Sequence, residues 1–335
     1  THGPLVIAAL KAGKNVYSAV PCASTIEEIY EIEELVRKTR LTYSMGETGY
    51  YRAPTVFCRN KMLAGEFGDF VYGEAQYNHD QRHFHYESNG PDWRKVAGIP
   101  PMLYPTHSTA MILGAMKGVY VKKVAAFGWV EEKLPDIFGT NGVNLWNNPF
   151  SNTAMLAQLS NGGVARISEN RRVAFAGPNT YISQFYGSDA CYEFSVAHHY
   201  FTHWDSNNPN KLLMDEVTKD LLPAGVYEKI NDPDFPQRIS DGAGFWDSAP
   251  VQNTARIPIE YRHEKNGHNG THHFMVDDFC QAAATGMLSP TNIWTAARYN
   301  LPGLVAHKSA INGGQLMDVP DLGEPPADWP VMQLD

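Results

Sequence analysis

The side chains best suited to acid–base chemistry occur in two short segments, one around Tyr77 and one ending at His107. In the second segment, Leu-Tyr-Pro-Thr-His, Tyr104 lies three residues before His107, and Pro105 favours the start of a helix. An imidazole titrates near neutrality, so His107 can accept a proton from a hydroxyl group and return it. Tyr77 and His79 alternate along a predicted strand and therefore face the same side. These residues could together move protons on a hydroxylated substrate.

The elements that must position these residues begin with an alternation of helices and strands. The spacing of apolar residues predicts helices over 4–12 and 24–38 and strands over 14–20 and 41–45. This order with short links is typical of parallel strands in a doubly wound α/β fold. Glu47 follows the second strand directly, and ligands of such folds bind at the carboxyl ends of strands. Glu47 is therefore a candidate carboxylate beside a ligand.

From about residue 50 the pattern changes to short alternating segments that are rich in aromatic residues. After a helix at 54–64, strands are predicted over 69–78, 121–130, 153–159, 163–170, 180–187 and 190–197. Such a run of strands with few helices predicts a large open, mostly antiparallel sheet. We therefore expect a doubly wound part at 1–49 and a separate α+β domain at 50–335.

The remaining segments of the second domain are expected to be less regular. Residues 201–250 are rich in Asp, Asn and Pro, which predicts an irregular insertion with one short helix near 212–222. Helices are predicted over 271–287 and 293–310, and the second should break near Pro302, because proline removes a helical hydrogen bond. Both helices are expected to pack back on the domain.

Composition and charge narrow the classes of partner. Of the 335 residues, 43% are hydrophobic and 19% are charged, as in ordinary soluble globular proteins. The net charge of −9 argues against a nucleic-acid-binding protein, which would carry a basic face. No apolar run approaches the roughly 20 residues that cross a bilayer, so no membrane partner is expected. The sequence is compatible with either the cytoplasm or the periplasm, because any signal peptide is expected to lie upstream of Thr1.

The first residues resemble a segment of a known enzyme family. His2 to Val16, with Ala-Leu-Lys-Ala-Gly-Lys inside it, is similar to a helix and strand of the glucose–fructose oxidoreductase/inositol dehydrogenase (Gfo/Idh/MocA) family. In that family a Glu-Lys-Pro motif follows, and the matching residues here are Ala19, Val20 and Pro21. Only the proline is kept, so the lysine that usually aids proton transfer is absent.

Further motifs resemble the branch of that family that also lacks the lysine, the NAD-dependent α-N-acetylgalactosaminidases. The matching segments are Met45-Gly46-Glu47, Tyr77-Asn78-His79-Asp80, Leu103-Tyr104-Pro105-Thr106-His107 and Met317-Asp318-Val319-Pro320-Asp321. The resemblance implies that residues 1–49 are the C-terminal part of a Rossmann dinucleotide-binding domain. It also implies that the phosphate-binding glycine loop lies upstream of Thr1, and that the cofactor is NAD or NADP.

The resemblance also implies a function and a set of site residues. The expected enzyme acts on a sugar or glycoside by hydride transfer at a sugar carbinol. The outcome is either net oxidation or redox-neutral glycoside cleavage by oxidation, elimination, hydration and reduction. The catalytic candidates are His107, Tyr104, Tyr77 and Glu47, and the substrate-binding candidates are His79, Arg82, Trp93, Arg94 and His272. The cofactor-binding candidates are His2, Pro21 and Glu47.

Two other classes of function remain open from the residues alone. A non-catalytic sugar-binding protein is suggested by Val20 in place of the lysine and by the missing glycine loop. A metal-dependent hydrolase is suggested by several histidines, among them His268 and His272, but no H-E-x-x-H motif accompanies them, and we expect no bound metal. In the favoured hypothesis, the exposed face of the open sheet joins copies of the chain into a homo-oligomer.

Overall fold

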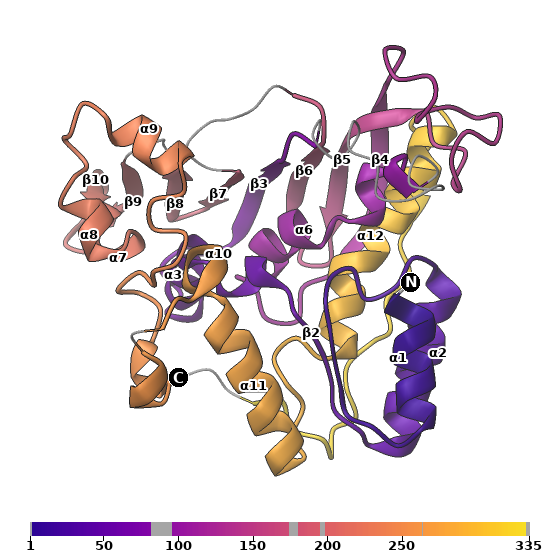
Figure 1. Ribbon diagram of the computed structural model, residues 1–335. Helices are drawn as coiled ribbons and strands as arrows, with labels where there is room; N and C mark the ends of the chain where they lie inside the picture. Colours follow the sequence, from indigo (N-terminus) through magenta and orange to yellow (C-terminus); the bar gives the residue numbers. More distant parts are fainter. Residues whose placement is uncertain (1, 82–95, 174–179, 195–197, 263, 333–335) are drawn as a thin grey trace.

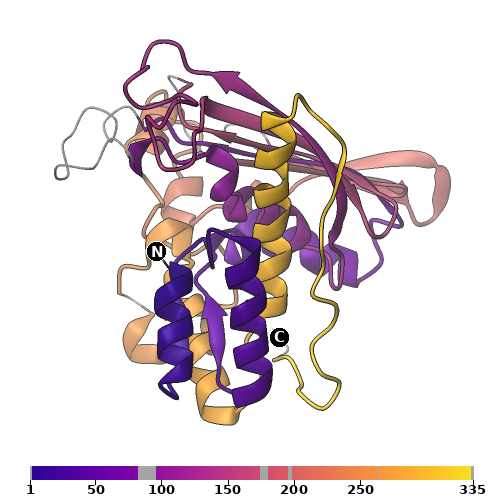
Figure 2. The ribbon, with the colours of Figure 1, turned by 90° about the vertical axis from the view of Figure 1, so that its right-hand side faces the viewer.

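The computed structural model describes residues 2–81, 96–173, 180–194, 198–262 and 264–332. In its N-terminal part, a two-stranded parallel sheet pairs β1 (Val16–Ser18) with β2 (Tyr43–Met45). Two helices, α1 (His2–Lys11) and α2 (Ile26–Thr39), lie side by side next to this sheet (Figures 1 and 2). The parallel pairing predicted from the helix–strand alternation is confirmed.

Local interactions explain where α2 begins and which face it buries. Thr25 accepts a hydrogen bond from the Glu28 N–H at 3.2 Å, and the Glu28 carboxylate accepts one from the Ser24 N–H at 3.1 Å. This reciprocal pair satisfies backbone donors that the start of a helix leaves open. The fully buried side chains of the helix recur every three to four residues and are Ile29, Ile32 and Val36.

The rest of the chain is organised around a large sheet. Within the described residues, nine strands form it in the order β10-β9-β8-β7-β3-β6-β5-β4-β11. Their bounds are β3 (Phe70–Asn78), β4 (Val121–Val130), β5 (Phe150–Leu159), β6 (Val164–Asn170), β7 (Tyr181–Gly187), β8 (Ala190–Phe194), β9 (His199–Asp205), β10 (Asn208–Glu216) and β11 (Met317–Asp318). Among these nine strands, β3 and β6 form the one parallel pair, and the other neighbours pair in antiparallel fashion. The predicted open, mostly antiparallel sheet is thus confirmed.

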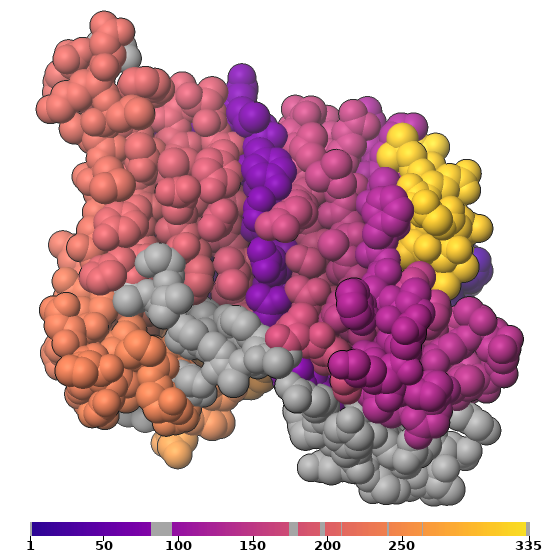
Figure 3. All heavy atoms as spheres, turned by 90° about the horizontal axis from the view of Figure 1, so that it is seen from above, coloured from indigo at the N-terminus to yellow at the C-terminus, as the bar shows by residue number. Residues whose placement is uncertain are grey.

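The helices of the described residues cover one face of this sheet and leave the other largely bare. Below it in Figure 1 lie α3 (Ala53–Leu63), α6 (Thr106–Leu113) and α12 (Ile293–Ile311), and α12 also contacts β2 and α2. The inward-facing Ala75, Ile167 and Phe185 are fully buried between the sheet and these helices. Figure 3 looks onto the opposite face, where strands of the sheet lie at the surface in the upper part of the view and β3 runs down the middle. No helix of the described ranges combines the length and apolarity needed to span a membrane.

The predicted break near Pro302 is wrong, because α12 runs without interruption from Ile293 to Ile311. A proline inside a helix costs about 3 kcal/mol. Here the surrounding turns are buried against η2 (Pro101–Leu103), and Gly303 lies so close to the Met102 carbonyl that a Cβ would clash with it. Packing of this buried helix outweighs the lost hydrogen bond.

The prediction for residues 201–250 is also wrong in its first part. The segment expected to contain a helix near 212–222 is instead strand β10, which pairs with β9, and only α7 (Thr218–Leu221) is helical. Leu212, Leu213 and Met214 pair with Trp204, His203 and Thr202, and the hydrogen bonds that the edge of β9 supplies favour the extended form. The irregular region begins only after α7, with α8 (Ala224–Tyr227) and α9 (Phe235–Ser240). It continues through η3 (Thr254–Arg256) and η4 (Ile259–Tyr261).

The irregular region is followed by α10 and α11. The turn α10 (Gly267–Gly270) leads into α11 (His272–Thr285), close to the predicted helix at 271–287. The predicted strand at 190–197 ends at Phe194, and residues 195–197 lie outside the described ranges.

Candidate functional site

A buried pair of Glu47 and His107 lies where the chain leaves β2 and where α6 begins. The Glu47 Oε1 atom accepts hydrogen bonds from the His107 Nδ1–H at 2.7 Å and from the Gly49 N–H at 2.6 Å. Glu47 is fully buried, and His107 is 4% exposed. Because Glu47 holds the proton on Nδ1, the Nε2 atom of His107 is left as the acceptor. It faces the Tyr104 hydroxyl at 3.3 Å.

Aromatic rings from three elements enclose His107. The Tyr77 ring, at the end of β3, meets the His107 ring edge-on with centroids 5.0 Å apart, and Tyr104 does so at 5.2 Å. Tyr181, the first residue of β7, stacks on Tyr77 at 4.8 Å. The Tyr77 hydroxyl is 2.7 Å from Nδ1 of His79. The structure thus brings Glu47, Tyr77, His79, Tyr104 and His107 into one cluster, which we call the His107 cluster.

Two arginines that sequence reasoning missed lie against these rings. The Arg52 guanidinium lies 3.9 Å from the Tyr181 ring centroid. The Arg171 guanidinium lies 4.7 Å from the Tyr77 ring and 5.3 Å from the Tyr104 ring. A cation over an aromatic face is attracted to the electrons of the ring, so each arginine fixes the position of the tyrosines it covers.

A third missed residue, Glu169, anchors Arg171. The two side chains form an ion pair at 2.8 Å, and the Ser108 hydroxyl donates a hydrogen bond to the other carboxylate oxygen. Complete burial raises the pKa of Glu169 well above its usual range, with Glu47 raising it further and Arg171 lowering it. A sequence signal existed, because Glu169 and Arg171 are two residues apart at the end of the strand predicted over 163–170 and can therefore face the same side, where a buried charge needs a partner.

The tyrosines of the His107 cluster hold their protons. Burial raises the pKa of Tyr77 and of Tyr104, and the positive charge of Arg171 lowers both but does not reverse the shift. Both phenols are therefore neutral near pH 7 and can donate a hydrogen bond or a proton.

The remaining residues predicted to bind substrate are not placed in the His107 cluster by the described part of the structure. Arg82, Trp93 and Arg94 lie outside the described residues. His272, at the start of α11, is in contact with His268, with ring centroids 4.6 Å apart. Among the described residues no group of three or more side chains is placed to hold a metal ion.

The residues expected to bind a dinucleotide lie at one end of the parallel sheet. His2 Nδ1 is 2.8 Å from the Pro21 carbonyl oxygen in the loop after β1, and Glu47 follows β2 at the same end. Within the described part of the chain, the buried Oε2 atom of Glu47 has no hydrogen-bond partner, so it can accept one from a ligand. These features fit the nicotinamide end of the cofactor. The sequence contains no G-x-G-x-x-G segment to bind the diphosphate.

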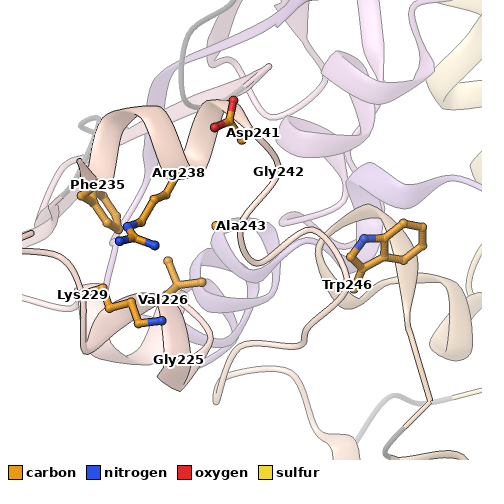
Figure 4. A pocket seen from close by; sticks show the side chains of 9 residues that line it. All are labelled: Gly225, Val226, Lys229, Phe235, Arg238, Asp241, Gly242, Ala243 and Trp246. Carbon is orange, nitrogen blue, oxygen red and sulfur yellow. The ribbon is translucent and has the colours of Figure 1, made fainter.

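A separate hollow of about 510 Å³ lies in the irregular region (Figure 4). Lys229, from the connection between α8 and α9, and Phe235 and Arg238, from α9, line one side, and Trp246 lies at the other. Its lining shares no residue with the His107 cluster.

Comparisons with known proteins agree with the resemblance in the motifs. The chain is 22% identical over 339 residues to a glycosyl hydrolase family 109 protein of Streptomyces filamentosus, covering 96% of this chain and 60% of that protein. It is 32% identical over 110 residues to an α-N-acetylgalactosaminidase of Shewanella oneidensis, covering 32% of this chain and 24% of the relative. The chain thus spans less than two thirds of the length of either relative. No protein-family model matches it.

Among solved structures, the chain resembles levoglucosan dehydrogenase in complex with NADH and L-sorbose. The TM-score is 0.67 at 16% sequence identity, and the match covers 96% of this chain and 77% of that one. This likeness confirms the α/β fold predicted from the sequence, with its Rossmann-like parallel part and its large antiparallel sheet.

Proposed function

We propose that this protein is an NAD-dependent enzyme that cleaves a glycoside through transient oxidation of a sugar carbinol. The observation that carries the proposal is the His107 cluster, in which a buried carboxylate orients an imidazole whose second nitrogen faces a hydroxyl group. Relatives named as glycosidases and a structural neighbour named as an NADH-binding dehydrogenase support it.

In the proposed reaction His107 is the base for the sugar hydroxyl. Its Nε2 atom takes the hydroxyl proton, and the negative charge of Glu47, 2.7 Å from Nδ1, stabilises the imidazolium that results. NAD, when bound, would supply the hydride acceptor for the oxidation and the hydride donor for the final reduction. Glu47, with its unpartnered Oε2, and the loop at Pro21 would hold the nicotinamide end.

The protonated tyrosines supply the hydrogen-bond and proton donors that the remaining steps need. Tyr104, 3.3 Å from the base, is placed to donate to the oxygen that becomes a carbonyl. A ketone acidifies the proton on the neighbouring carbon. A base takes this proton as the bond to the aglycone breaks, the departing oxygen takes up a proton, and water adds to the resulting double bond before the ketone is reduced. Tyr77 can supply the proton for the departing oxygen, because His79 behind its hydroxyl can replace the proton that the phenol gives up.

The proposal is tested by measuring p-nitrophenol release from α- and β-glycosides, including the N-acetylgalactosaminide, with and without NAD⁺. We expect NAD⁺-dependent release without accumulation of NADH. Steady NADH formation from free sugars without aglycone release would instead identify a plain sugar dehydrogenase. If neither signal appears and NAD⁺ does not bind, the protein is a non-catalytic sugar-binding relative and the proposal is wrong.

We further propose that the protein is a homo-oligomer joined through the bare face of the large sheet. This face carries exposed apolar side chains on β4, β5 and β10: Trp129, Leu156 and Met214 are 66%, 53% and 66% exposed. The strand register places Leu156 opposite Arg166, and Arg166 opposite Glu74, so an apolar side chain lies next to a pair of opposite charges on one surface. Exposed apolar side chains on a face that also carries paired charges can form an interface between copies of a chain.

A further inference from the structure

The turn α10 contains a backbone conformation that side chains rarely adopt. His268, Asn269 and Gly270 have φ angles of 52°, 57° and 75°, so three consecutive residues are left-handed. Residues with a Cβ avoid this region, and they persist there only where surrounding contacts enforce it. Backbone strain of this kind is concentrated at sites that bind ligands, so the turn is a candidate ligand-binding element.

Contacts from other segments hold the turn against the His107 cluster. The Asn269 N–H donates to the Phe245 carbonyl at 2.7 Å, and Gln252 Nε2 donates to the Asn269 carbonyl at 3.3 Å. Arg52 Nη1 donates to Asn269 Oδ1 at 2.9 Å. Because the same guanidinium covers Tyr181 of the cluster, Arg52 ties the strained turn directly to the cluster.

These contacts leave His268 with an unused polar atom. Its ring lies between Phe245, at 5.2 Å, and His272, at 4.6 Å. Its Nδ1 atom is buried, and nothing in the described ranges hydrogen-bonds to it. Leaving a buried polar atom unpaired is unfavourable, so a bound molecule that satisfies it would be stabilised.

The charge state of His268 limits what it can do. Burial, followed by the neighbouring His272, His107 and Arg52, lowers the pKa of His268 to about 4, against an opposing effect of Glu47. The ring is therefore neutral near pH 7 and is unsuited to protonate a leaving group there. A neutral imidazole instead offers one donor and one acceptor to an uncharged polar partner.

We infer that His268 is a specificity-determining residue that binds a hydroxyl group of the sugar through Nδ1. The inference rests on the proposed function and deepens it, because it assigns a sugar contact to a residue that no motif singled out for substrate. The strained turn and its ties to Arg52 then serve to hold this imidazole beside the His107 cluster.

Two substitutions separate binding from strain. Glycine adopts left-handed φ angles freely, so His268→Gly removes the imidazole and relieves the backbone at once. Asparagine tolerates the same conformation and keeps a polar atom near the position of Nδ1, so His268→Asn is the conservative variant. Asn147→Gly relieves a φ of 51° in a distant exposed loop and serves as the matched control.

The experiment measures binding of methyl α-N-acetylgalactosaminide and its single-deoxy analogues to the NAD⁺-loaded protein by calorimetry. We expect His268→Gly to weaken binding of the parent sugar about ten-fold and His268→Asn to weaken it less, with Asn147→Gly unchanged. One deoxy analogue should bind the unchanged protein about ten-fold more weakly than the parent, yet bind His268→Gly as well as the parent does.

Equal binding of every sugar by the unchanged protein and by His268→Gly, with a melting temperature that rises from the relief of strain, would overturn the inference. The result is independent of turnover. If the unchanged protein binds the sugar but releases no aglycone and forms no NADH, the proposed function fails while the role of His268 in binding is still decided.

Discussion

At the scale of single residues, the central feature is a set of charges buried with little access to water. Glu47 and Glu169 are fully buried, and each has one basic partner, His107 and Arg171 respectively. Burying a charge is costly unless a partner of opposite charge is also buried. His107 and Arg171 therefore do two things. They contact the aromatic rings of the His107 cluster, and they stabilise the fold by pairing with a buried carboxylate.

The pair of Glu169 and Arg171 leads to a prediction on stability. In Arg171→Met, Glu169 has lost its partner, and we expect the free energy of unfolding to fall by about 3 kcal/mol at pH 8. Loss of the Arg171 charge, which lowers the pKa of Glu169 against the effect of burial, raises that pKa further, so the folded variant holds the Glu169 proton where its unfolded state has released it. Stability should therefore fall as the pH rises above about 4.5, and the loss should be smaller at pH 5.

Urea unfolding at pH 5 and pH 8 measures this effect. Arg171→Met combined with Glu169→Gln removes the buried charge, and this double variant should regain much of the stability at pH 8. A loss that is equal at both pH values and is not restored by Glu169→Gln would mean that packing of the Arg171 stem, not the ion pair, is responsible.

At the scale of elements, a side-chain hydrogen bond links strands β8 and β9 through a buried histidine. The Tyr192 hydroxyl lies 2.7 Å from Nδ1 of His199, and the two rings are nearly parallel with centroids 6.0 Å apart. Burial, and then the neighbouring His198, lowers the pKa of His199 to about 4, while Glu216 raises it. The folded protein thus keeps His199 neutral between these two strands.

This lowered pKa predicts acid sensitivity in a defined pH range. In the unfolded chain a histidine takes up a proton near pH 6.5, whereas folded His199 does so near pH 4. The stabilising contribution is therefore present above pH 6.5 and is lost as the pH falls from 6.5 to 4, by at most about 3 kcal/mol.

The measurement is the melting temperature of the protein and of His199→Gln across this pH range. The variant should be less stable at pH 7.5 but should lose less stability on acidification, because it carries one proton-binding group fewer. Thr202→Ser, on the same strand and not titratable, is the control and should keep the original slope. An unchanged slope in His199→Gln would contradict the prediction.

At the scale of the whole molecule, the helices of the described residues cover one face of the nine-stranded sheet and leave the other largely bare (Figures 1 and 3). The proposed association through this face predicts that the protein runs as more than one chain in light scattering. Leu156→Lys places a charge among the exposed apolar side chains of the proposed interface and should yield single chains with little change in melting temperature.

Leu63→Lys is the matched control for that test. Leu63 is 67% exposed on α3, which lies on the opposite side of the sheet. This variant should leave the oligomeric state unchanged. A single-chain mass for the unaltered protein would rule out the proposed association.

The sequence by itself determined the elements whose signals are local. The capped start of α2, the apolar spacing of its buried face and the alternating strands follow from hydrogen bonds and periodicities within a few residues. The motifs also placed Glu47, Tyr77, Tyr104 and His107 at the ends of such elements. Where a neighbouring element overrides local preference, as for Pro302 in α12 and for strand β10, prediction failed.

Only the tertiary structure decided which residues meet. Arg52, Glu169, Arg171, Tyr181 and His268 come from segments far apart in the chain, and no local pattern indicates that they surround His107. Their roles depend on distances of a few ångströms across β3, β6, β7, α6 and the α10 turn. Strand register, parallel pairing of β3 with β6 and packing of α6 set those distances, because each is a long-range interaction that forms only in the folded chain.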